Sequence, residues 1–583
     1  MTPGDIAMLL SETTGLRVQV TSPGLGAASL RIQGMRGRYT QLLSDGLPLY
    51  GGQAGSIGLL QIPPMDLAQV EVIKGVASSL YGASALGGVV NLVSRRPGAE
   101  AEHEMLVNQT TQGQTNALIW LSGPMKQGSR WGYTFLGGVD RQQRHDVDAD
   151  GWADLPGFDR ISVRPRFTWD NGEGRSVFFT VGVMGEDRTG GTLPGRVVPD
   201  GTAYEEALDT RRVDFGLVAR WLIGNKVASV RGSLMRQQHR HVFGPTIEND
   251  VHRTGFGELS LTGVRGAHTW VVGGAVQTDD YRAQDVPIVN YDIDGVSVFA
   301  QDEFVAHPRL TLSGSARVDR DAIHGVFVSP RASALVRAPG GWTIRASGGS
   351  GYFVARSVTE ETEASGFSRL ASFDFREAER ARSASIDANR EFGPVELNAT
   401  VFGSRVTNTL RIRPSIGSSS NYDLLPVAGA TRTTGVELLG RIRRGAVTVT
   451  PTYTYVHATE PDPVTGVRGD VAYTPRHAAG VTAMWEREGV ARIGFEAYYT
   501  GRQTLEHNPF RATSPAYPYF GALVERQVGR LRVFVNFENF ANLRQTRTNP
   551  LVRPAQNFDG RWTVDAWAPL EGFAVNGGVR VRF

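Results

Sequence analysis

Apolar and polar residues alternate with a period of two from about residue 104 to the end of this 583-residue chain. Within 310–319, apolar residues or glycine fill the even positions from Leu310 to Val318, and polar residues fill the odd positions. This period places the apolar side chains on one face of an extended strand. The pattern returns at 395–401, 491–499 and 573–583 and predicts a long all-β region.

The predicted connections between these strands alternate in length. Short connections fall near 170–174, 224–226 and 338–341, and long polar connections fall near 189–211, 239–254, 353–377, 409–430, 459–473, 504–516 and 541–570. Short turns on one side and long loops on the other are typical of outer-membrane barrels, and counting in strict alternation gives about 22 strands. Tryptophans near predicted strand ends, such as Trp120, Trp131 and Trp169, fit the aromatic belts of a membrane protein. A soluble sandwich or propeller is the competing interpretation, but the chain has no blade-length repeat.

Residues 1–97 lack this membrane pattern and instead contain short strands and turns of an α+β unit. A barrel of about 22 strands encloses a lumen too wide for side chains to fill. The sequence therefore predicts a 22-stranded antiparallel transmembrane β-barrel at 98–583, with residues 1–97 as a small α+β plug domain in its lumen.

Composition narrows the functional classes. The 61 basic and 58 acidic residues nearly cancel, and only three of the basic residues are lysines, which disfavours a polycationic nucleic-acid binder. The absence of cysteine excludes disulfides, thiolate nucleophiles and cysteine-ligated metals. The chain contains no run of about 18 apolar residues, which excludes a bundle of transmembrane helices. Motifs of serine hydrolases, zinc proteases and P-loop enzymes are also missing, so we do not expect an enzyme. We further expect a monomer that binds no nucleic acid.

Two N-terminal strings carry a family resemblance. RIQGMRGRYTQLLSDGLPLYGG at 31–52 and IPPMDLAQVEVIKGVASSLYGASALGGVVNLVSRRP at 62–97 resemble the plug signature of TonB-dependent outer-membrane receptors, and YTPRHAAGV and VNFENFANLRQT resemble recurrent barrel segments. The resemblance implies an importer in the outer membrane of a Gram-negative bacterium, surrounded by lipid and lipopolysaccharide. Its cargo would be a ferric siderophore or related metal chelate. The TonB–ExbB–ExbD complex would supply the energy for its uptake. Uptake of cobalamin, haem or another organic ligand is an alternative, as is an uncoupled surface-binding or adhesin protein.

The resemblance also bears on the start of the chain and on coupling. Neither a signal peptide nor a TonB box is recognisable before the plug strings, so we expect an N-terminally truncated receptor. Family plugs usually carry arginine where Gln33 stands and often at Lys74, and these cations pair with glutamates of the barrel wall at positions such as Glu437. The resemblance thus implies plug–barrel coupling through Gln33, Lys74 and Glu437, with Gln33 uncharged. The alternative is a Lys74 that is merely solvated.

Candidate ligand contacts fall into two sets. Glycines permit close backbone approach and a tyrosine offers a stacking face, which favours the plug-apex residues Tyr50, Gly51, Gly52, Gln53, Gly55 and Ser56. In the predicted outer loops, histidines are candidates for contacts with iron, copper or haem. Arginines there are candidates for binding anionic chelates or lipopolysaccharide phosphates. These histidines and arginines are His239, His241, Arg411, Arg413, Arg502 and Arg547. For the histidines, the alternative is that they occur together by chance, and for the arginines, that arginine is common throughout the chain. For the plug-apex residues, the alternative is an ordinary apical loop.

One acidic segment resembles the opening of a calcium loop. Asp146, Asp148 and Asp150 precede Gly151 with the required spacing, but position twelve is Gly157 where a bidentate glutamate is expected. The sequence therefore predicts a possible Ca²⁺ site in an outer loop, with a solvated acidic loop as the alternative. No other cofactor is expected apart from the transported chelate.

Overall fold

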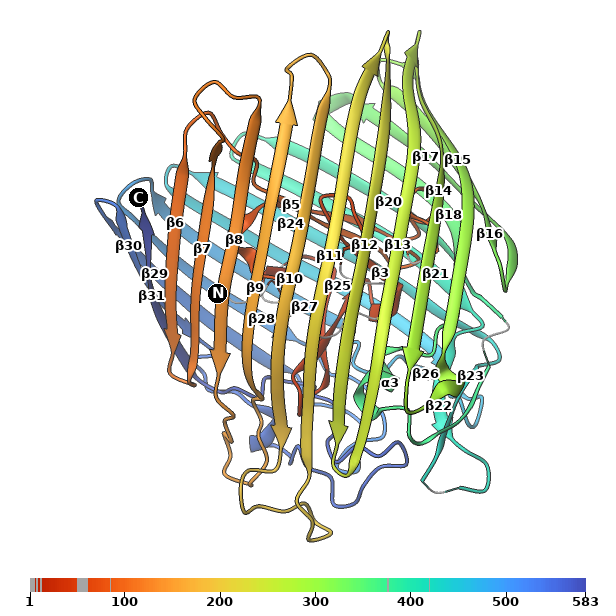
Figure 1. Cartoon of the computed structure of the whole chain (residues 1–583), viewed down its shortest axis with the longest axis vertical. Coiled ribbons are helices and arrows are strands. Elements are labelled where there is room, and N and C mark those ends of the chain that lie inside the picture. Colours follow the sequence, from red (N-terminus) through yellow and green to blue (C-terminus); the bar gives the residue numbers. More distant parts are fainter. Residues whose placement is uncertain are drawn as a thin grey trace.

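The computed structural model describes residues 6, 9–10, 13–49, 61–83, 85–374, 377–418 and 420–583. Its main feature is a closed antiparallel barrel of 22 strands (Figure 1). The barrel strands in chain order are β6 (Glu102–Thr110), β7 (Gln114–Pro124), β8 (Trp131–Gln142), β9 (Gly157–Asp170), β10 (Ser176–Gly191), β11 (Glu205–Ile223), β12 (Lys226–Phe243), β13 (Thr246–Arg265), β14 (His268–Ala283), β15 (Tyr291–His307), β16 (Leu310–Asp321), β17 (Gly325–Ala338), β18 (Trp342–Phe353), β20 (Glu379–Phe392), β21 (Val395–Thr407), β24 (Ala430–Arg444), β25 (Val447–Pro461), β27 (His477–Arg487), β28 (Ala491–Thr500), β29 (Tyr517–Val528), β30 (Leu531–Glu538) and β31 (Ala574–Arg582).

The first and last barrel strands pair and close the ring, with Val107 of β6 opposite Val579 of β31. Closure leaves every strand with two neighbours, so the wall presents no free edge to lipid. The alternation expected at 310–319 is confirmed in β16, where Leu312 and Val318 lie on the outer face and are about 40% exposed. Within the described residues, no helix is long and apolar enough to cross a bilayer.

The N-terminal unit lies inside the barrel (Figure 1). Its secondary structure comprises the hairpin β1 (Leu16–Ser22) and β2 (Ala27–Ile32), the sheet of β3 (Thr40–Ser44), β5 (Gly88–Ser94) and β4 (Leu67–Lys74), the short helix α2 (Ser78–Tyr81) and the 3-10 turns η1 (Gly37–Tyr39) and η3 (Pro64–Asp66). A small core that includes Ile32, Val90 and Leu92 holds it together. The Ser79 and Ser315 hydroxyl oxygens lie 3.0 Å apart, which places α2 against β16. The predicted fold, a barrel with an α+β plug in its lumen, is confirmed.

The long connections gather at one end of the barrel, at the bottom of Figure 1. They carry α3 (Glu360–Ser365), the small sheet of β19 (Leu370–Phe373), β23 (Tyr422–Pro426) and β22 (Leu410–Pro414), the strand extension β26 (Arg468–Asp470) and the 3-10 turns η4 (Pro287–Val289) and η6 (Gln545–Arg547). A further 3-10 turn, η5 (Pro339–Gly341), lies in a short connection at the other end. In outer-membrane β-barrels the longer connections are extracellular.

Two expectations about this architecture are wrong. The loop expected at 239–254 is a strand hairpin, in which β12 and β13 meet at a two-residue turn where Gly244 has a φ of 58°. His239 and His241 lie on a strand and face the lumen rather than lipid. Polar residues at these positions therefore do not indicate a loop. Trp120 is not in an interfacial belt: it is 1% exposed and lies inside the barrel, with the Arg95 guanidinium 3.5 Å from its ring centroid.

Candidate functional site

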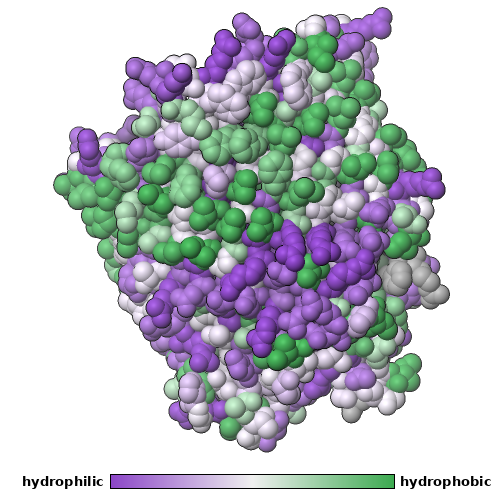
Figure 2. Space-filling view, in the orientation of Figure 1, coloured by the Kyte–Doolittle hydropathy of each residue, from purple (hydrophilic) through white to green (hydrophobic). Residues whose placement is uncertain are grey.

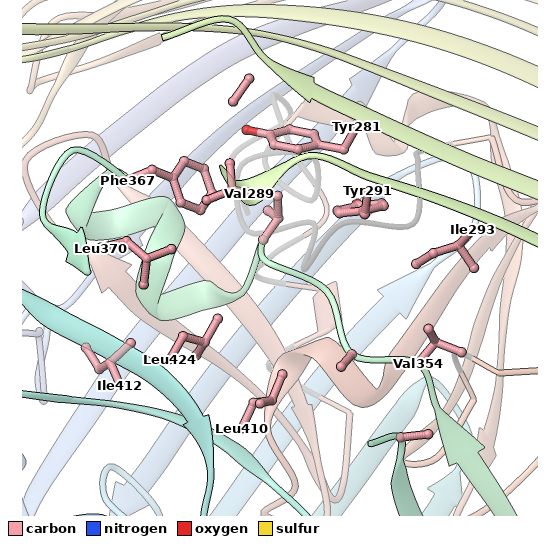
Figure 3. Close-up of a cluster of buried hydrophobic side chains, with 14 of the residues drawn as sticks. Tyr281, Val289, Tyr291, Ile293, Val354, Phe367, Leu370, Leu410, Ile412 and Leu424 are labelled. Atoms are coloured by element: carbon pink, nitrogen blue, oxygen red, sulfur yellow. The ribbon is translucent and has the colours of Figure 1, made fainter. Parts of the chain in front are cut away.

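Outer connections fold inward and close the barrel mouth with a hydrophobic cluster (Figure 3). Phe367 and Leu370 from the connection after β18 pack with Leu410 and Leu424 from the connection after β21. Tyr281, on β14, stacks on Tyr291, on β15, with ring centroids 5.5 Å apart. Because protein interiors pack tightly, side chains joined in this way exclude a ligand unless the connections move.

A buried ion-pair network joins the plug to this closed mouth. The Arg36 guanidinium, which precedes η1, is 2.8 Å from Glu361 of α3 and 2.9 Å from Glu460 at the end of β25. Arg38 is 3.3 Å from Glu361 and 3.4 Å from Glu379 of β20. These arginines thus hold three separate barrel segments against one plug turn.

Arg411 completes this mouth network, which we define as Arg36, Arg38, Glu361, Glu379, Arg411, Glu460 and Glu506. Its guanidinium is 2.5 Å from Glu460 and also contacts Glu506 in the connection after β28. Arg411 was predicted to attract an anionic ligand, but its side chain is only 3% exposed and carboxylates surround it. In this conformation it ties two connections together.

A second plug–barrel contact forms where the sequence predicted one. The Gln33 side-chain amide donates a 3.0 Å hydrogen bond to Glu437 of β24, and the Lys74 ammonium forms an ion pair with the other oxygen of the same carboxylate. Lys74 also donates to the Thr14 carbonyl oxygen at 2.6 Å. Glu437 therefore receives one neutral and one charged plug side chain, and we call these three residues the plug lock. Its part in energy coupling stays a prediction.

We expect Glu437→Ala to loosen the plug locally. The substitution leaves the Lys74 ammonium without a carboxylate and should cost about 1–3 kcal/mol in the local opening free energy, because both groups are largely buried. Hydrogen exchange of β4 should therefore quicken, less so in Glu437→Gln, which keeps the hydrogen bond to Gln33. Gln33→Arg should slow exchange by adding a second cation beside Glu437. Equal exchange in all variants would contradict a stabilising lock.

The predicted calcium segment lies in the outer connection between β8 and β9. Asp146, Asp148 and Asp154 each place one carboxylate oxygen within 4.8 Å of the others, the one such trio found in the described part of the chain. Asp154, at position nine of the calcium-loop pattern, takes the place expected for Asp150, whose carboxylate accepts the Trp152 backbone N–H at 2.8 Å. Burial and neighbouring carboxylates raise the pKa of Asp150 to about 6 and that of Asp154 to about 7. Uncompensated negative charge of this kind suits a hard cation such as Ca²⁺.

Two cavities flank the plug and the mouth. An outer cavity of about 540 Å³ is lined by apolar residues that include Trp152, Val198 and Phe510, together with Arg553. A cavity of about 630 Å³ lies deeper, between the β1–β2 hairpin and the barrel wall, with lining that includes Gln112 and Tyr498. The outer cavity offers apolar contact and the Arg553 guanidinium, and the inner cavity likewise combines a mostly apolar lining with polar groups.

The remaining predicted contacts are not gathered into one site. His239 faces Asp250 at 3.0 Å, and no metal-like group that includes His239 or His241 occurs among the residues that the structure describes. Arg413 lies 3.9 Å from Asp423, and Arg502 and Arg547 are exposed in separate connections. The predicted plug-apex residues Tyr50, Gly51, Gly52, Gln53, Gly55 and Ser56 lie outside the described residues.

Sequence reasoning missed the mouth network and Asp154. Arg36 and Arg38 stand inside the quoted string RIQGMRGRY, but Glu361 and Glu460 are more than 300 residues away along the chain. No local pattern connects such partners. Asp154 had a detectable signal, since it occupies position nine of the same loop pattern that singled out Asp146.

Comparisons with known proteins agree with this architecture. Residues 2–89 match the family model described as TonB-dependent receptor plug domain, and residues 100–540 match that described as TonB dependent receptor-like, beta-barrel. The ferric enterobactin receptor PfeA of Pseudomonas aeruginosa has the same fold, with a TM-score of 0.79, 16% identity and coverage of 100% of this chain and 96% of that chain. The siderophore receptor PirA of Acinetobacter baumannii gives a TM-score of 0.78 at 14% identity, with the same coverage.

Curated relatives match over shorter segments. The vitamin B12 transporter BtuB of Photobacterium profundum is 30% identical over 158 residues, which are 25% of this chain and 25% of that protein. The ferrioxamine receptor of Yersinia enterocolitica is 30% identical over 169 residues, 29% of this chain and 21% of that protein. The chain thus matches no more than a quarter of the length of either relative. Since the barrel model alone spans most of the sequence, the chain belongs to the TonB-dependent receptors of the Gram-negative outer membrane.

Proposed function

We propose that this receptor imports a ferric siderophore or a related metal chelate, with the TonB–ExbB–ExbD complex supplying energy from the proton-motive force. The plug inside the lumen (Figure 1) carries this proposal, because its described residues are tied to the barrel wall and stand in the way of a large ligand. Buried ion pairs hold the plug at Glu437 and at the mouth network. Breaking buried pairs is costly, so passage needs an input of work.

The choice of a ferric chelate is supported by the relatives. The ferrioxamine receptor and the two structural neighbours are named for siderophores, while the matching vitamin B12 transporters make cobalamin the second candidate. The outer cavity, with its apolar wall and Arg553, fits a chelate that combines an apolar body with negative charge.

Growth of a deletion strain that carries or lacks this gene tests the proposal. Under iron starvation, supplied hydroxamate or catecholate iron chelates should restore growth only with the gene and only with functional TonB. Growth restored by cobalamin in a cobalamin-dependent strain would favour the second candidate. Uptake that continues without TonB, or binding with no uptake, would indicate the uncoupled surface-binding alternative.

We further propose that the Asp146–Asp148–Asp154 trio holds Ca²⁺ outside the cell. The cation would take carboxylate oxygens, its preferred ligands, and would fix the β8–β9 connection that forms one wall of the outer cavity.

Calcium should therefore protect this connection. With millimolar Ca²⁺ we expect slower proteolysis and hydrogen exchange at 143–156, and Asp154→Asn should remove the effect while the exposed control Asp200→Asn keeps it. Ligand carboxylates must lose their protons to bind, so affinity should be about tenfold weaker at pH 6 than at pH 8, given a pKa of about 7 for Asp154. Equal protection by Mg²⁺ and Ca²⁺, or protection that survives in Asp154→Asn, would contradict the site.

A further inference from the structure

Two plug arginines face the inner cavity from neighbouring strands. Arg17 of β1 and Arg31 of β2 lie directly opposite each other in the hairpin, and both line the cavity of about 630 Å³ between the hairpin and the barrel wall. Arg31 is 5% exposed, and Arg17 is partly buried. We call these two residues the arginine pair.

Alternation along the hairpin turns the arginine pair away from the plug core. Leu16 of β1 and Leu30 and Ile32 of β2 lie in that core. Arg17 and Arg31 are each one position away from these residues, and successive side chains of a strand point to opposite faces. The hairpin therefore presents an apolar face to the plug and a charged face to the cavity.

The inner cavity lies in the extracellular half of the barrel. Its lining includes Tyr498 near the outer end of β28, Tyr517 at the outer start of β29, and Trp567 of the last outer connection. On the barrel face in Figure 2, a hydrophilic field adjoins the hydrophobic one on this same side of the long connections. The arginine pair thus belongs to the side of the molecule that faces the external medium.

Only neutral groups receive the arginine pair. The Arg31 guanidinium donates to the Ala472 carbonyl oxygen at 2.8 Å and to the Thr474 hydroxyl at 3.5 Å. The Arg17 guanidinium donates to the side-chain oxygen of Gln503 at 2.8 Å. In the part of the chain that the structure describes, no ion pair with a carboxylate is found for either arginine, so these contacts supply hydrogen bonds but no negative charge.

Strand register makes this missing negative charge costly. Like charges directly opposite each other across a strand pair are destabilising, and a buried charge without a partner is unfavourable. Glu360 and Glu361 act on Arg31 only from a distance, because both contact Arg36, at 3.8 and 2.8 Å. The described residues therefore leave the positive charge of the hairpin uncompensated.

The carboxylates that line the same cavity do not fill this role. They are Asp154, Glu496, Glu538 and Glu571. The Glu538 carboxylate accepts hydrogen bonds from the side-chain amides of Asn536 and Asn576, at 2.6 and 2.9 Å. The Glu571 carboxylate accepts the backbone N–H of Leu570 at 3.2 Å. These acids are held by other groups of the wall, and the arginine pair remains available to a separate anion.

We propose that the arginine pair is an anion site, which holds a carboxylate or phosphate group of a small molecule in the inner cavity. Such a group would accept hydrogen bonds from both guanidinium groups and replace their repulsion by attraction, because arginine matches these oxygens in bidentate geometry. A volume of about 630 Å³ is typical of small-molecule pockets. The group has two sources with the same chemistry, the imported chelate or a free anion of the medium, and the site does not depend on which ligand the receptor imports.

Calorimetric titration of the full-length protein in a non-ionic detergent tests the site, with succinate and inorganic phosphate as probes. Both should bind the parent protein, whereas succinamide, which has the same carbon skeleton without charge, should bind at least roughly tenfold more weakly. Arg31→Gln should weaken the binding of succinate roughly tenfold, because charge-assisted hydrogen bonds are lost. Arg31→Lys keeps the charge without the fork of donors and should be intermediate.

Arg96→Gln is the matched control for this titration. Arg96 is also a plug arginine, but it pairs with Asp45 at 3.4 Å and does not line the inner cavity, so succinate should bind this variant as it binds the parent. Equal binding by the parent and Arg31→Gln, an equal loss in the control, or succinamide that binds as tightly as succinate would overturn the proposal.

Hydrogen exchange locates the anion and checks the fold of the variants. Saturating succinate should slow exchange at 16–32 in the parent and leave it unchanged in Arg31→Gln, while unaltered exchange of β5 shows that the plug of the variant is folded. Arg17→Gln repeats the test from the other strand. Succinate that slows exchange equally in the parent and in both arginine variants would contradict the site.

Competition on the parent protein separates the two sources of the anion. If succinate displaces the growth-supporting chelate, the acidic group of the chelate itself occupies the site. If both bind together, the site holds a free anion of the medium. Because succinate binding is measured without transport, its loss in Arg31→Gln supports the anion site even if the receptor imports a different ligand.

Discussion

Replacement of Arg36 by methionine is expected to detach the plug from the outer mouth. The substitution removes the guanidinium that lies 2.8 Å from Glu361 and 2.9 Å from Glu460, while Arg38 and Arg411 keep their contacts with these buried carboxylates. Removing one partner of a buried pair costs about 3–5 kcal/mol, and we expect the lower part of that range because Arg38 and Arg411 still compensate part of the carboxylate charge. The connection after β18, which carries α3, should then open more often, and hydrogen exchange at 354–374 should rise by two to three orders of magnitude, roughly as the factor of ten per 1.4 kcal/mol requires.

Two further variants sharpen this test. Arg36→Lys keeps the charge but cannot hold two carboxylates in a fork, so its effect should be intermediate. Arg320→Met removes an exposed arginine from the outer face of β16 and should leave exchange at 354–374 unchanged. If Arg36→Met exchanged at the parent rate, the ion pairs would not hold the mouth closed.

The closed conformation suggests how ligand capture and transport are linked. The same plug turn that holds Arg36 and Arg38 contacts segments from α3, β20 and β25. A ligand that displaced any of these carboxylates would loosen the outer connections and the plug together. Under the proposed function, the mouth network is therefore the contact through which a ligand outside the barrel would act on the plug.

The barrel could be predicted from sequence because its signal is local. Alternation within each strand reports which residues face lipid, and β16 shows the agreement residue by residue, with Leu312 and Val318 exposed on the outer face. The same reasoning failed at 239–254, where β12 and β13 extend beyond the apolar band and alternate polar with polar. Trp120 failed for a related reason, since an aromatic residue near a strand end can face the lumen as readily as the lipid.

The site was less predictable because its contacts are distant in sequence. Gln33, Lys74 and Glu437 were found through family resemblance, and the structure brings them together. Arg36 and Glu460 are 424 residues apart and carry no shared motif, so only the folded chain reveals that they pair. Arg411 illustrates a related limit: it was expected to contact an anionic ligand, and no local pattern indicated that carboxylates of the protein pair with it.

If the receptor imports its ligand as proposed, the plug must move relative to the wall, and the chain's lack of cysteine makes that requirement testable with a disulfide. Ser79 of α2 and Ser315 of β16 place their hydroxyl oxygens 3.0 Å apart, so Ser79→Cys/Ser315→Cys brings two thiols close enough to bond if their geometry adjusts. Ser347→Cys/Ser385→Cys offers the same 3.0 Å spacing between two barrel strands and serves as the control.

The decisive measurement is uptake of the growth-supporting chelate by cells that carry each oxidised pair, before and after mild reduction. The account predicts that the Ser79–Ser315 pair cross-links, abolishes uptake and regains it on reduction, while the Ser347–Ser385 pair transports at the parent rate throughout. Failure of the first pair to cross-link, or undiminished uptake by the cross-linked protein, would contradict a plug that sits in the lumen and must move for the ligand to pass.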